Sequence, residues 1–256
     1  MNPKVSLLAK SSFNAKEFIK LLKYYRLTWR RSRGASQAEE LVEVAGRVCY
    51  MSFGKRQSPK SNKEYIQHLI ASGHESVLEH VSWTFLVTGV SRAFTHQFVR
   101  HRIGFSYSQL SQQYHDEEDA DFVVPYNMDK FPEAMKAWEE SIKVAKSSYV
   151  KIRNAVIREE NRLPMKNNKR EIIRAMRSMA RSVLPNSTET KIVVTANARS
   201  LRNYLNARGS IIGDSEMRIV SACFLEILQK DSPELFSDFK LKHLDDNSPI
   251  VVREKH

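Results

Sequence analysis

Arginine and uncharged hydrogen-bonding side chains are concentrated in FVRHRIGFSYSQLSQQY, residues 98–114. Residues 80–115 contain no carboxylate, so Arg100 and Arg102 have no acidic partner nearby in the sequence. A guanidinium presents a planar fork of donors that suits a phosphate or a pyrimidine carbonyl. The Ser, Gln and Tyr side chains that follow offer the neutral hydrogen bonds that a nucleobase or sugar needs. The stretch therefore indicates an anionic ligand. The alternative is an arginine-rich helix end that complements its own dipole.

A second segment, residues 190–213, also lacks acids and carries four cations: Lys191, Arg199, Arg202 and Arg208. Within it, Asn197, Arg199 and Asn203 fall at an expected strand-to-helix junction. Free backbone amides at a helix start, together with Arg and Asn side chains, can clamp an anion or a cofactor. Two such segments in one chain favour a ligand with several phosphates.

Other kinds of chemistry have less support. In GHESVLEH, residues 73–80, the histidines His74 and His80 are six residues apart and lie on different faces of a helix, so we predict no metal site. Cys49 and Cys223 occur in apolar helical contexts, where we expect buried structural thiols rather than nucleophiles. No Walker loop or G-x-G-x-x-G follows a strand, so a dinucleotide is not held in the Rossmann manner.

Periodicity, caps and breakers predict the elements that position these residues. We expect strands at 4–10, 80–90, 122–125 and 190–197, and helices at 36–50, 62–73, 91–102, 133–160, 169–183, 199–209 and 215–230. Ser36 and Ser91 are the expected N-caps of two helices, and the tail from residue 231 reads as irregular. Helices outweigh strands and do not alternate as regular βαβ units, which predicts an α+β fold.

The composition excludes several classes of protein. No window approaches about 18 apolar residues, no signal peptide is evident, and two cysteines exclude a disulfide framework. We therefore expect a soluble, cytoplasmic protein. The net charge of +12 gathers in clusters such as 23–33 and 166–177, which we interpret as solvated helix faces or as surfaces that steer phosphorylated ligands. Nucleic-acid binding stays open, although no zinc-finger, RNP or basic-zipper pattern occurs.

Four segments in order resemble the flavin-dependent thymidylate synthases. The family signature is RHR, seven residues, then Ser, and here Arg100-His101-Arg102 precedes IGFSYSQL and Ser111. GHESVLEH resembles the family's flavin-side segment, RSVLPNSTETKIVVTANARSLRNYLNAR its second nucleotide region, and ELVEVAGRVCY its N-terminal helix. The resemblance spans residues 36–230.

The resemblance implies an enzyme that methylates deoxyuridylate at C5. Methylenetetrahydrofolate is the carbon donor, NADPH the source of reducing equivalents and FAD the mediator, without a cysteine nucleophile. It further implies a single domain over residues 1–256, built on a central antiparallel or mixed sheet that is flanked by helices and has a mostly helical remainder. The family is a homotetramer with active sites at subunit interfaces, and neither a nucleic acid nor a membrane is an expected partner.

Roles carry over from the family by matching positions. The resemblance implies a deoxyuridylate site lined by Gln97, Arg100, Gln109, Leu110, Ser111, Gln112, Gln113, Arg181 and Arg208. It implies FAD contacts from Ser76, Arg100, His101, Arg102, Asn197, Ala198, Arg199 and Asn203. Arg208 would hold the uracil edge and favour an ionised N3, His74 would stack near the flavin and folate, and Ser111 is the third candidate for a catalytic role.

The signature itself is one residue too long. Eight residues separate Arg102 from Ser111 where the family has seven, because IG replaces a single residue. Either a bulge near Gly104 absorbs the extra residue, or the pocket is altered.

Two further departures concern the substrate. Gln113 stands where the family has an arginine, and Ile212 stands near the place of a histidine that many relatives carry. Whether another basic residue, such as Lys191 or Arg202, compensates for Gln113 stays open. An enzyme acting on another pyrimidine nucleotide, such as uridylate, is therefore the alternative function, and a basic nucleic-acid-binding protein is a more distant one.

Overall fold

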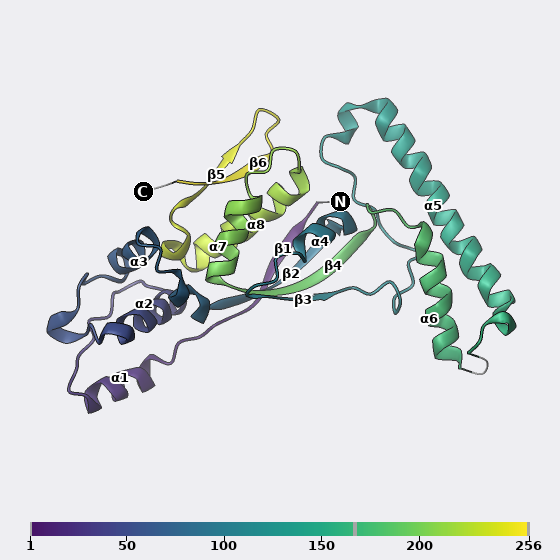
Figure 1. The fold of residues 1–256 in the computed structure, drawn as a ribbon. Coiled ribbons are helices and arrows are strands. Elements are labelled where there is room, and N and C mark those ends of the chain that lie inside the picture. The colour runs from purple at the N-terminus through teal and green to yellow at the C-terminus, as the bar shows by residue number, and fades with distance from the viewer. Residues whose placement is uncertain (1, 166–167, 255–256) are drawn as a thin grey trace. The chain divides into compact units, whose positions relative to one another are not determined.

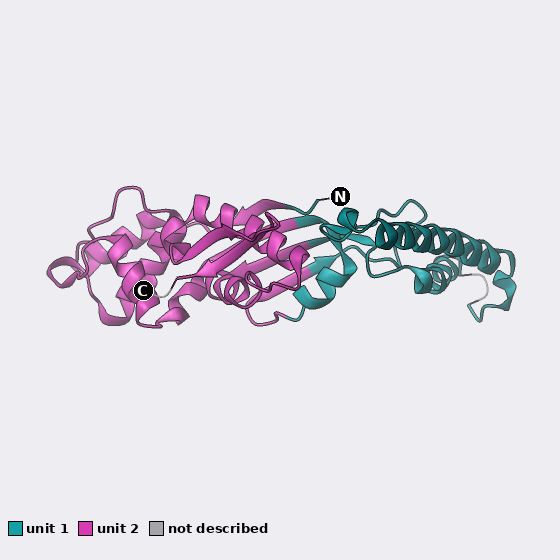
Figure 2. Ribbon diagram, turned by 90° about the horizontal axis from the view of Figure 1, so that it is seen from above, with its two compact units in different colours: residues 1–4, 87–100, 108–192 teal, residues 5–86, 101–107, 193–256 magenta. Residues whose placement is uncertain are grey.

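The structure, a computed structural model, describes residues 2–165 and 168–254 (Figure 1). Contacts divide the chain into two compact units: unit 1 is made of residues 1–4, 87–100 and 108–192, and unit 2 of residues 5–86, 101–107 and 193–256 (Figure 2). Part of the basic cluster 166–177 and the end of the tail 231–256 lie outside the described residues. None of the described helices combines the length and the apolar character needed to cross a membrane.

A four-stranded sheet runs in the order β1 (Lys4–Lys10), β2 (Ser82–Ser91), β4 (Glu189–Asn197), β3 (Phe105–Gln109). Beyond one end of β3 the Leu110 N–H donates to the Lys191 carbonyl (2.9 Å). Beyond the other end the Asn197 N–H donates to the Gly104 carbonyl (3.2 Å), so β3 runs antiparallel to β4. The sheet as a whole is antiparallel. The predicted α+β fold is confirmed.

The core of unit 2 forms where β2 meets the helices α7 (Ala198–Arg208) and α8 (Ser215–Asp231). Burial along β2 alternates, and the side chains of Trp83 and Phe85 are 1% and 0% exposed. The Phe85 ring centroid lies 4.9 Å from that of Phe224, edge to face, and the Trp83 indole N–H donates to Asp231 (2.8 Å). Alternation along the strand therefore buries one face of β2 against α8.

Three helices near the N-terminus complete one side of unit 2: α1 (Ala15–Tyr24), α2 (Gln37–Tyr50) and α3 (Asn62–Ala71). The Ser36 cap of α2 is confirmed and forms a full capping box with Glu39. Helix α1 was not predicted. Its Phe18 ring packs edge-on against Trp29 (5.7 Å) and tilted against Phe53 (5.6 Å), so contacts with distant residues stabilise this short lysine-bearing helix.

The tail after residue 231 contains a hairpin, so its prediction as irregular is wrong. Strands β5 (Phe239–His243) and β6 (Pro249–Arg253) pair antiparallel. Buried Asp238 accepts hydrogen bonds from Arg202 (2.7 Å) and Arg253 (2.8 Å). Burial opposes the ionisation of Asp238, but the two arginines outweigh it and keep its pKa below the ordinary value. Only the Arg202 contact comes from a distant element, so the hairpin itself is a local structure that the prediction missed.

Unit 1 contains helices α4 (Arg92–Phe98), α5 (Pro132–Arg158) and α6 (Lys169–Ala180), with a 3₁₀ turn at Arg181–Val183. Helices α5 and α6 pack side by side (Figure 1). The predicted Ser91 cap of α4 is confirmed, since Ser91 accepts the Phe94 N–H (3.0 Å). The predicted strand at 122–125 is wrong, because Phe122 makes only an isolated bridge with Thr188.

Candidate functional site

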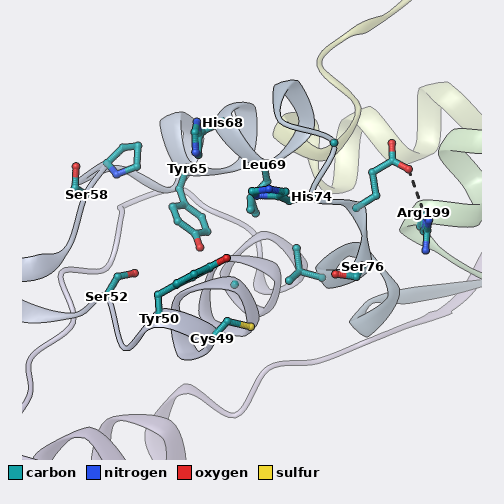
Figure 3. A pocket seen from close by; sticks show the side chains of 15 residues that line it. Cys49, Tyr50, Ser52, Ser58, Tyr65, His68, Leu69, His74, Ser76 and Arg199 are labelled. Atoms are coloured by element: carbon teal, nitrogen blue, oxygen red, sulfur yellow. Dashed lines mark ion pairs between the residues drawn. The ribbon is translucent and has the colours of Figure 1, made fainter.

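A pocket of ≈ 830 Å³ in unit 2 lies among the end of α2, the start of a 3₁₀ helix at Glu75–His80, and α3. The rings of Tyr50 and Tyr65 and the imidazole of His74 surround it (Figure 3). Cys49, which was predicted to be buried, is exposed and lines the same pocket. Aromatic faces around a hollow of this size suit a planar ring ligand.

Buried Arg47 fixes the walls of this pocket. Its Nε donates to Glu43 (2.6 Å) and its Nη2 to the Pro59 carbonyl (2.6 Å). The guanidinium also lies 4.1 Å from the ring centroid of Tyr65. Gly46 leaves room for that ring, because a Cβ there would lie 2.6 Å from the Tyr65 hydroxyl. The walls are therefore held by a paired buried charge, which is costly to break.

Ser76 and Arg199 line the polar side of the pocket with His74. Arg199 is not free to meet an anion. Its Nη1 donates to Glu79 (2.5 Å), and its Nε lies 3.6 Å from a Glu75 oxygen. The expectation that Arg199 lacks an acidic partner is therefore wrong, because its carboxylates come from a segment far away in the sequence.

The arginine-rich signature follows α4 and turns sharply at Ile103 and Gly104. Gly104 has φ +71°, and a Cβ there would lie 2.1 Å from Ser200 Oγ and 2.6 Å from Asn197 Nδ2. The Ser200 hydroxyl also donates to the Ile103 carbonyl (2.7 Å). The extra residue of this signature therefore lies in a tight turn against the start of α7, at a position where only glycine fits.

Two predicted flavin contacts have structural roles at this helix start. Asn197 is the N-cap of α7, and its side-chain oxygen accepts the Ser200 N–H (2.9 Å). Ala198 is 0% exposed, and its N–H donates to the Val81 carbonyl (3.0 Å). Asn203, in contrast, is exposed on α7. The Oδ1 of Asn197 is thus engaged in the cap, and the side chain of Ala198 is buried.

His101 and Arg208 form a hydrogen-bonded pair in unit 2. Arg208 Nε donates to His101 Nε2 (3.0 Å), so Nε2 is unprotonated. Burial, and then the charge of Arg208, lower the pKa of His101. The imidazole packs edge-on against Tyr204 (5.2 Å), and the Tyr107 hydroxyl donates to the His101 carbonyl (2.8 Å). A neutral imidazole therefore holds one nitrogen of Arg208, and among the described residues no carboxylate pairs with this arginine.

In unit 1 the predicted nucleotide-binding segment forms a compact turn after β3. The Ser111 carbonyl accepts the N–H groups of Tyr114 (3.1 Å) and His115 (2.9 Å), and its hydroxyl oxygen accepts the Gln113 N–H (3.3 Å). Gln112 is buried, and its side-chain nitrogen has no hydrogen-bond partner among the residues that the structure describes. The turn thus orients Ser111 through the backbone and leaves a buried donor available to a ligand.

Arginines converge on this turn. Arg92 Nη2 donates to the Leu110 carbonyl (2.8 Å), and Arg177 Nη1 donates to the Tyr114 carbonyl (2.6 Å). Burial lowers the pKa of Arg92, Glu117 opposes that shift, and the like charge of nearby Arg181 adds to it. Like charges held close together favour an anion as their partner.

The cations of the two acid-free segments differ in whether the fold gives them carboxylate partners. In the second, Lys191 pairs with Glu189 (3.0 Å), and Arg202 is buried against Asp238 (2.7 Å). In the first, Arg100 and Arg102 are exposed and have no carboxylate partner in the described part of the chain. Among the described residues, cations in acid-free windows thus lack a carboxylate partner at Arg100, Arg102 and Arg208. The windows were misleading at Lys191, Arg199 and Arg202, which have one.

Sequence reasoning missed Arg174 and Arg177. Arg174 Nη2 donates to the Tyr114 hydroxyl (2.7 Å), next to the contact of Arg177. The signal was present, because Arg174, Arg177 and Arg181 are three and four residues apart, on one face of a helix. Arg177 thus contacts Tyr114, the residue that follows Gln113 in the sequence.

Comparisons with known proteins show which family this chain resembles. Residues 33–234 match the family model described as "Thymidylate synthase complementing protein". A protein of Mycolicibacterium vanbaalenii is 38% identical over 251 residues, which cover 97% of this chain and 94% of that protein. One of Corynebacterium aurimucosum is 36% identical over 249 residues, 96% and 95% of the two chains. A third, of Mycobacterium bovis, is 37% identical over 251 residues, 97% and 94%. Each of the three is named flavin-dependent thymidylate synthase.

Proposed function

The chain belongs to the flavin-dependent thymidylate synthase family, and we propose that it methylates deoxyuridylate at C5 to thymidylate. Methylenetetrahydrofolate is the carbon donor and NADPH the reductant. The observation that carries this proposal is the similarity over nearly the whole length of both proteins, 97% and 94%. The family match also runs through residues of both units, which supports one functional domain.

Unit 2 contains side chains of the kinds that bind the ring and the phosphates of FAD. Flat aromatic faces at Tyr50, Tyr65 and His74 suit a flavin ring, and exposed Arg102 offers an unpaired cation for a phosphate. When bound, FAD supplies the redox step between NADPH and the transferred carbon. The further flavin contacts in the proposal are Ser76, Arg100, His101, Asn197, Ala198, Arg199 and Asn203. Arg199 can contact a phosphate only if it releases Glu79.

Unit 1 residues bind the nucleotide in this proposal. Arg92, Arg177 and Arg181 supply positive charge for a phosphate beside the turn of Ser111, and charge-assisted hydrogen bonds to phosphate are among the stronger ones. The remaining proposed contacts are Gln97, Arg100, Gln109, Leu110, Gln112 and Gln113. Since Ser111 has no evident base, its hydroxyl serves as a hydrogen-bonding group and not as the nucleophile.

Arg208 acts on the uracil ring. The imidazole of His101 occupies its Nε, which leaves the terminal nitrogens for a ligand. A guanidinium beside the uracil edge stabilises negative charge at N3 and so raises the electron density at C5. His101 is therefore a positioning residue for this step as well as a proposed flavin contact.

The proposal requires no cysteine nucleophile. Burial raises the pKa of the Cys223 thiol, which keeps it protonated. Cys49 is exposed and lies at the end of α2. The Cys223 thiol therefore lacks the electropositive setting that activates a catalytic cysteine.

A homotetramer is part of the proposal. Large apolar side chains near the proposed contacts are exposed in the single chain: Ile103 is 90%, Tyr50 76% and Ile212 73% exposed. Exposed apolar clusters of this kind are typical of interfaces. Light scattering should then give four times the 29.6 kDa of one chain.

The test is product formation with deoxyuridylate and uridylate side by side, with NADPH and methylenetetrahydrofolate present. We expect thymidylate and a yellow protein that releases FAD on denaturation. Preference for uridylate would favour the alternative substrate, which is suggested by Gln113 in the place of the family's arginine. Colourless protein without turnover would refute the flavin-dependent activity.

A further inference from the structure

A second pocket in unit 2, of ≈ 660 Å³, is strongly basic. Its lining includes Arg30, Arg31, Arg33 and Lys60, with Glu64 as the only carboxylate. Among these cations Arg31 is the one paired with a carboxylate in the described residues, through both its Nε and its Nη2 to Glu40 (2.7 Å each). Three exposed cations therefore face this hollow without an acidic partner.

Hydrogen bonds between its two lining segments hold the walls of the basic pocket in place. Buried Gln57 accepts the Arg30 N–H (2.9 Å) and donates to the carbonyls of Arg30 (2.9 Å) and Lys60 (3.2 Å). The Ser32 hydroxyl accepts the Asn62 N–H (2.7 Å). These bonds tie the segment 30–33 to the segment at Lys60, so the cations stand on fixed backbone on both sides.

The basic pocket is a neighbour of the aromatic pocket. Ser58 and Pro59 line the aromatic pocket of ≈ 830 Å³, and the next two residues, Lys60 and Ser61, line the basic one. One continuous segment, residues 58–61, therefore contributes to the lining of both pockets.

We propose that the basic pocket binds the γ-linked glutamate tail of the folate co-substrate while its ring system lies beside the proposed flavin ring at the aromatic pocket. This inference rests on the proposed function. The tail carries single carboxylates at intervals along its length. The cations are also separated from one another, since Arg30 and Arg33 lie on one segment and Lys60 on another. Guanidinium forks match carboxylates in geometry, and the fixed walls lower the cost of ordering the tail.

The test compares KM for methylenetetrahydrofolate carrying one glutamate with KM for the form carrying four. An exposed ion pair strengthens binding by about twofold to fivefold, so three pairs should lower KM for the longer tail by about eightfold to about a hundredfold. In the triple variant Arg30→Gln, Arg33→Gln, Lys60→Gln, the two KM values should become equal. The wild-type difference should also shrink as salt is raised, because exposed charges are screened.

The control is Lys55→Gln with Arg56→Gln, two exposed cations of the same region that line a different pocket. This double variant should keep the wild-type ratio of KM values. Equal KM values in wild type, or an equal loss in the control, would overturn the inference while turnover itself upholds the proposed function. A rise in KM for NADPH alone in the triple variant would assign the pocket to phosphate and also overturn it. No turnover with either folate would instead refute the proposed function.

Discussion

Replacing His101 by phenylalanine removes the acceptor that holds Arg208 and keeps a ring against Tyr204. The bond in question joins Arg208 Nε to His101 Nε2 at 3.0 Å. We expect the variant to retain folded structure, since the aromatic packing is preserved, and to lose turnover. His101→Gln, which offers an oxygen acceptor, should recover most of the loss.

The size of the effect follows from the type of bond. A hydrogen bond that involves a charged group contributes about 1.5–3 kcal/mol, and because both side chains are only part-buried the effective value is about 1–2 kcal/mol. Each 1.4 kcal/mol is about tenfold in rate. We therefore expect kcat/KM of His101→Phe to fall about tenfold, mainly through kcat, because Arg208 acts on the uracil ring.

Protonation of His101 should have the same effect as the mutation. The pKa of His101 lies below its ordinary value of 6.5, first through burial and then through Arg208. The neutral form is thus present above 6.5, and the bond is lost as the pH falls through the lowered pKa. Since the unfolded chain takes up its proton first, stability also falls as the pH drops below about 6.5.

The assay is the initial rate of thymidylate formation between about pH 5 and pH 8, with FAD content measured in each variant. Wild type should show an acid limb below pH 6.5, and His101→Gln should lack it. An identical acid limb in His101→Gln, or full kcat in His101→Phe at unchanged FAD content, would refute the positioning role.

Four other outcomes are expected. Gly104→Ala forces a side chain into an occupied space at positive φ and should cost about 1–3 kcal/mol; an unchanged melting temperature would contradict the tight turn. Arg202→Ala leaves buried Asp238 with Arg253 as its remaining arginine partner and should cost about 1.5–3 kcal/mol in urea unfolding, and a cost below about 0.5 kcal/mol would be inconsistent with it. Arg177→Ala should raise KM for deoxyuridylate about tenfold, and Arg177→Lys should have a KM between those of wild type and Arg177→Ala. A KM for Arg177→Ala equal to that of wild type would show that Arg177 is not part of the site. Cys49→Ser with Cys223→Ser should retain turnover, and its loss would point to a thiol nucleophile.

Local signals explain which elements could be predicted. The Ser36 and Ser91 caps each bond to a backbone N–H three residues on, so the sequence alone contains both partners. The long helices repeat the same pattern over several turns. Helix α1 depends on a partner farther along the chain, Phe53 for Phe18, which no short window contains. The hairpin β5–β6 pairs within residues 239–253, so its two strands were missed although they are close in the sequence.

The same limit applies to the site. Arg199 and Glu79 are 120 residues apart and Arg202 and Asp238 are 36 apart, so an acid-free window said nothing about their pairing. The pair of His101 and Arg208, 107 residues apart, became visible only in the structure. Spacing did carry one usable signal, the arginines of α6, because contacts along one helix face are local.

The most direct measurement of the central claim is tritium release from C5-labelled deoxyuridylate with NADPH and methylenetetrahydrofolate present, by the flavin-loaded wild type and by Arg208→Ala. We predict release by the wild type, none from labelled uridylate, and no release by the variant although it keeps its FAD. Release by the variant at the wild-type rate, or none by the flavin-loaded wild type, would contradict the account.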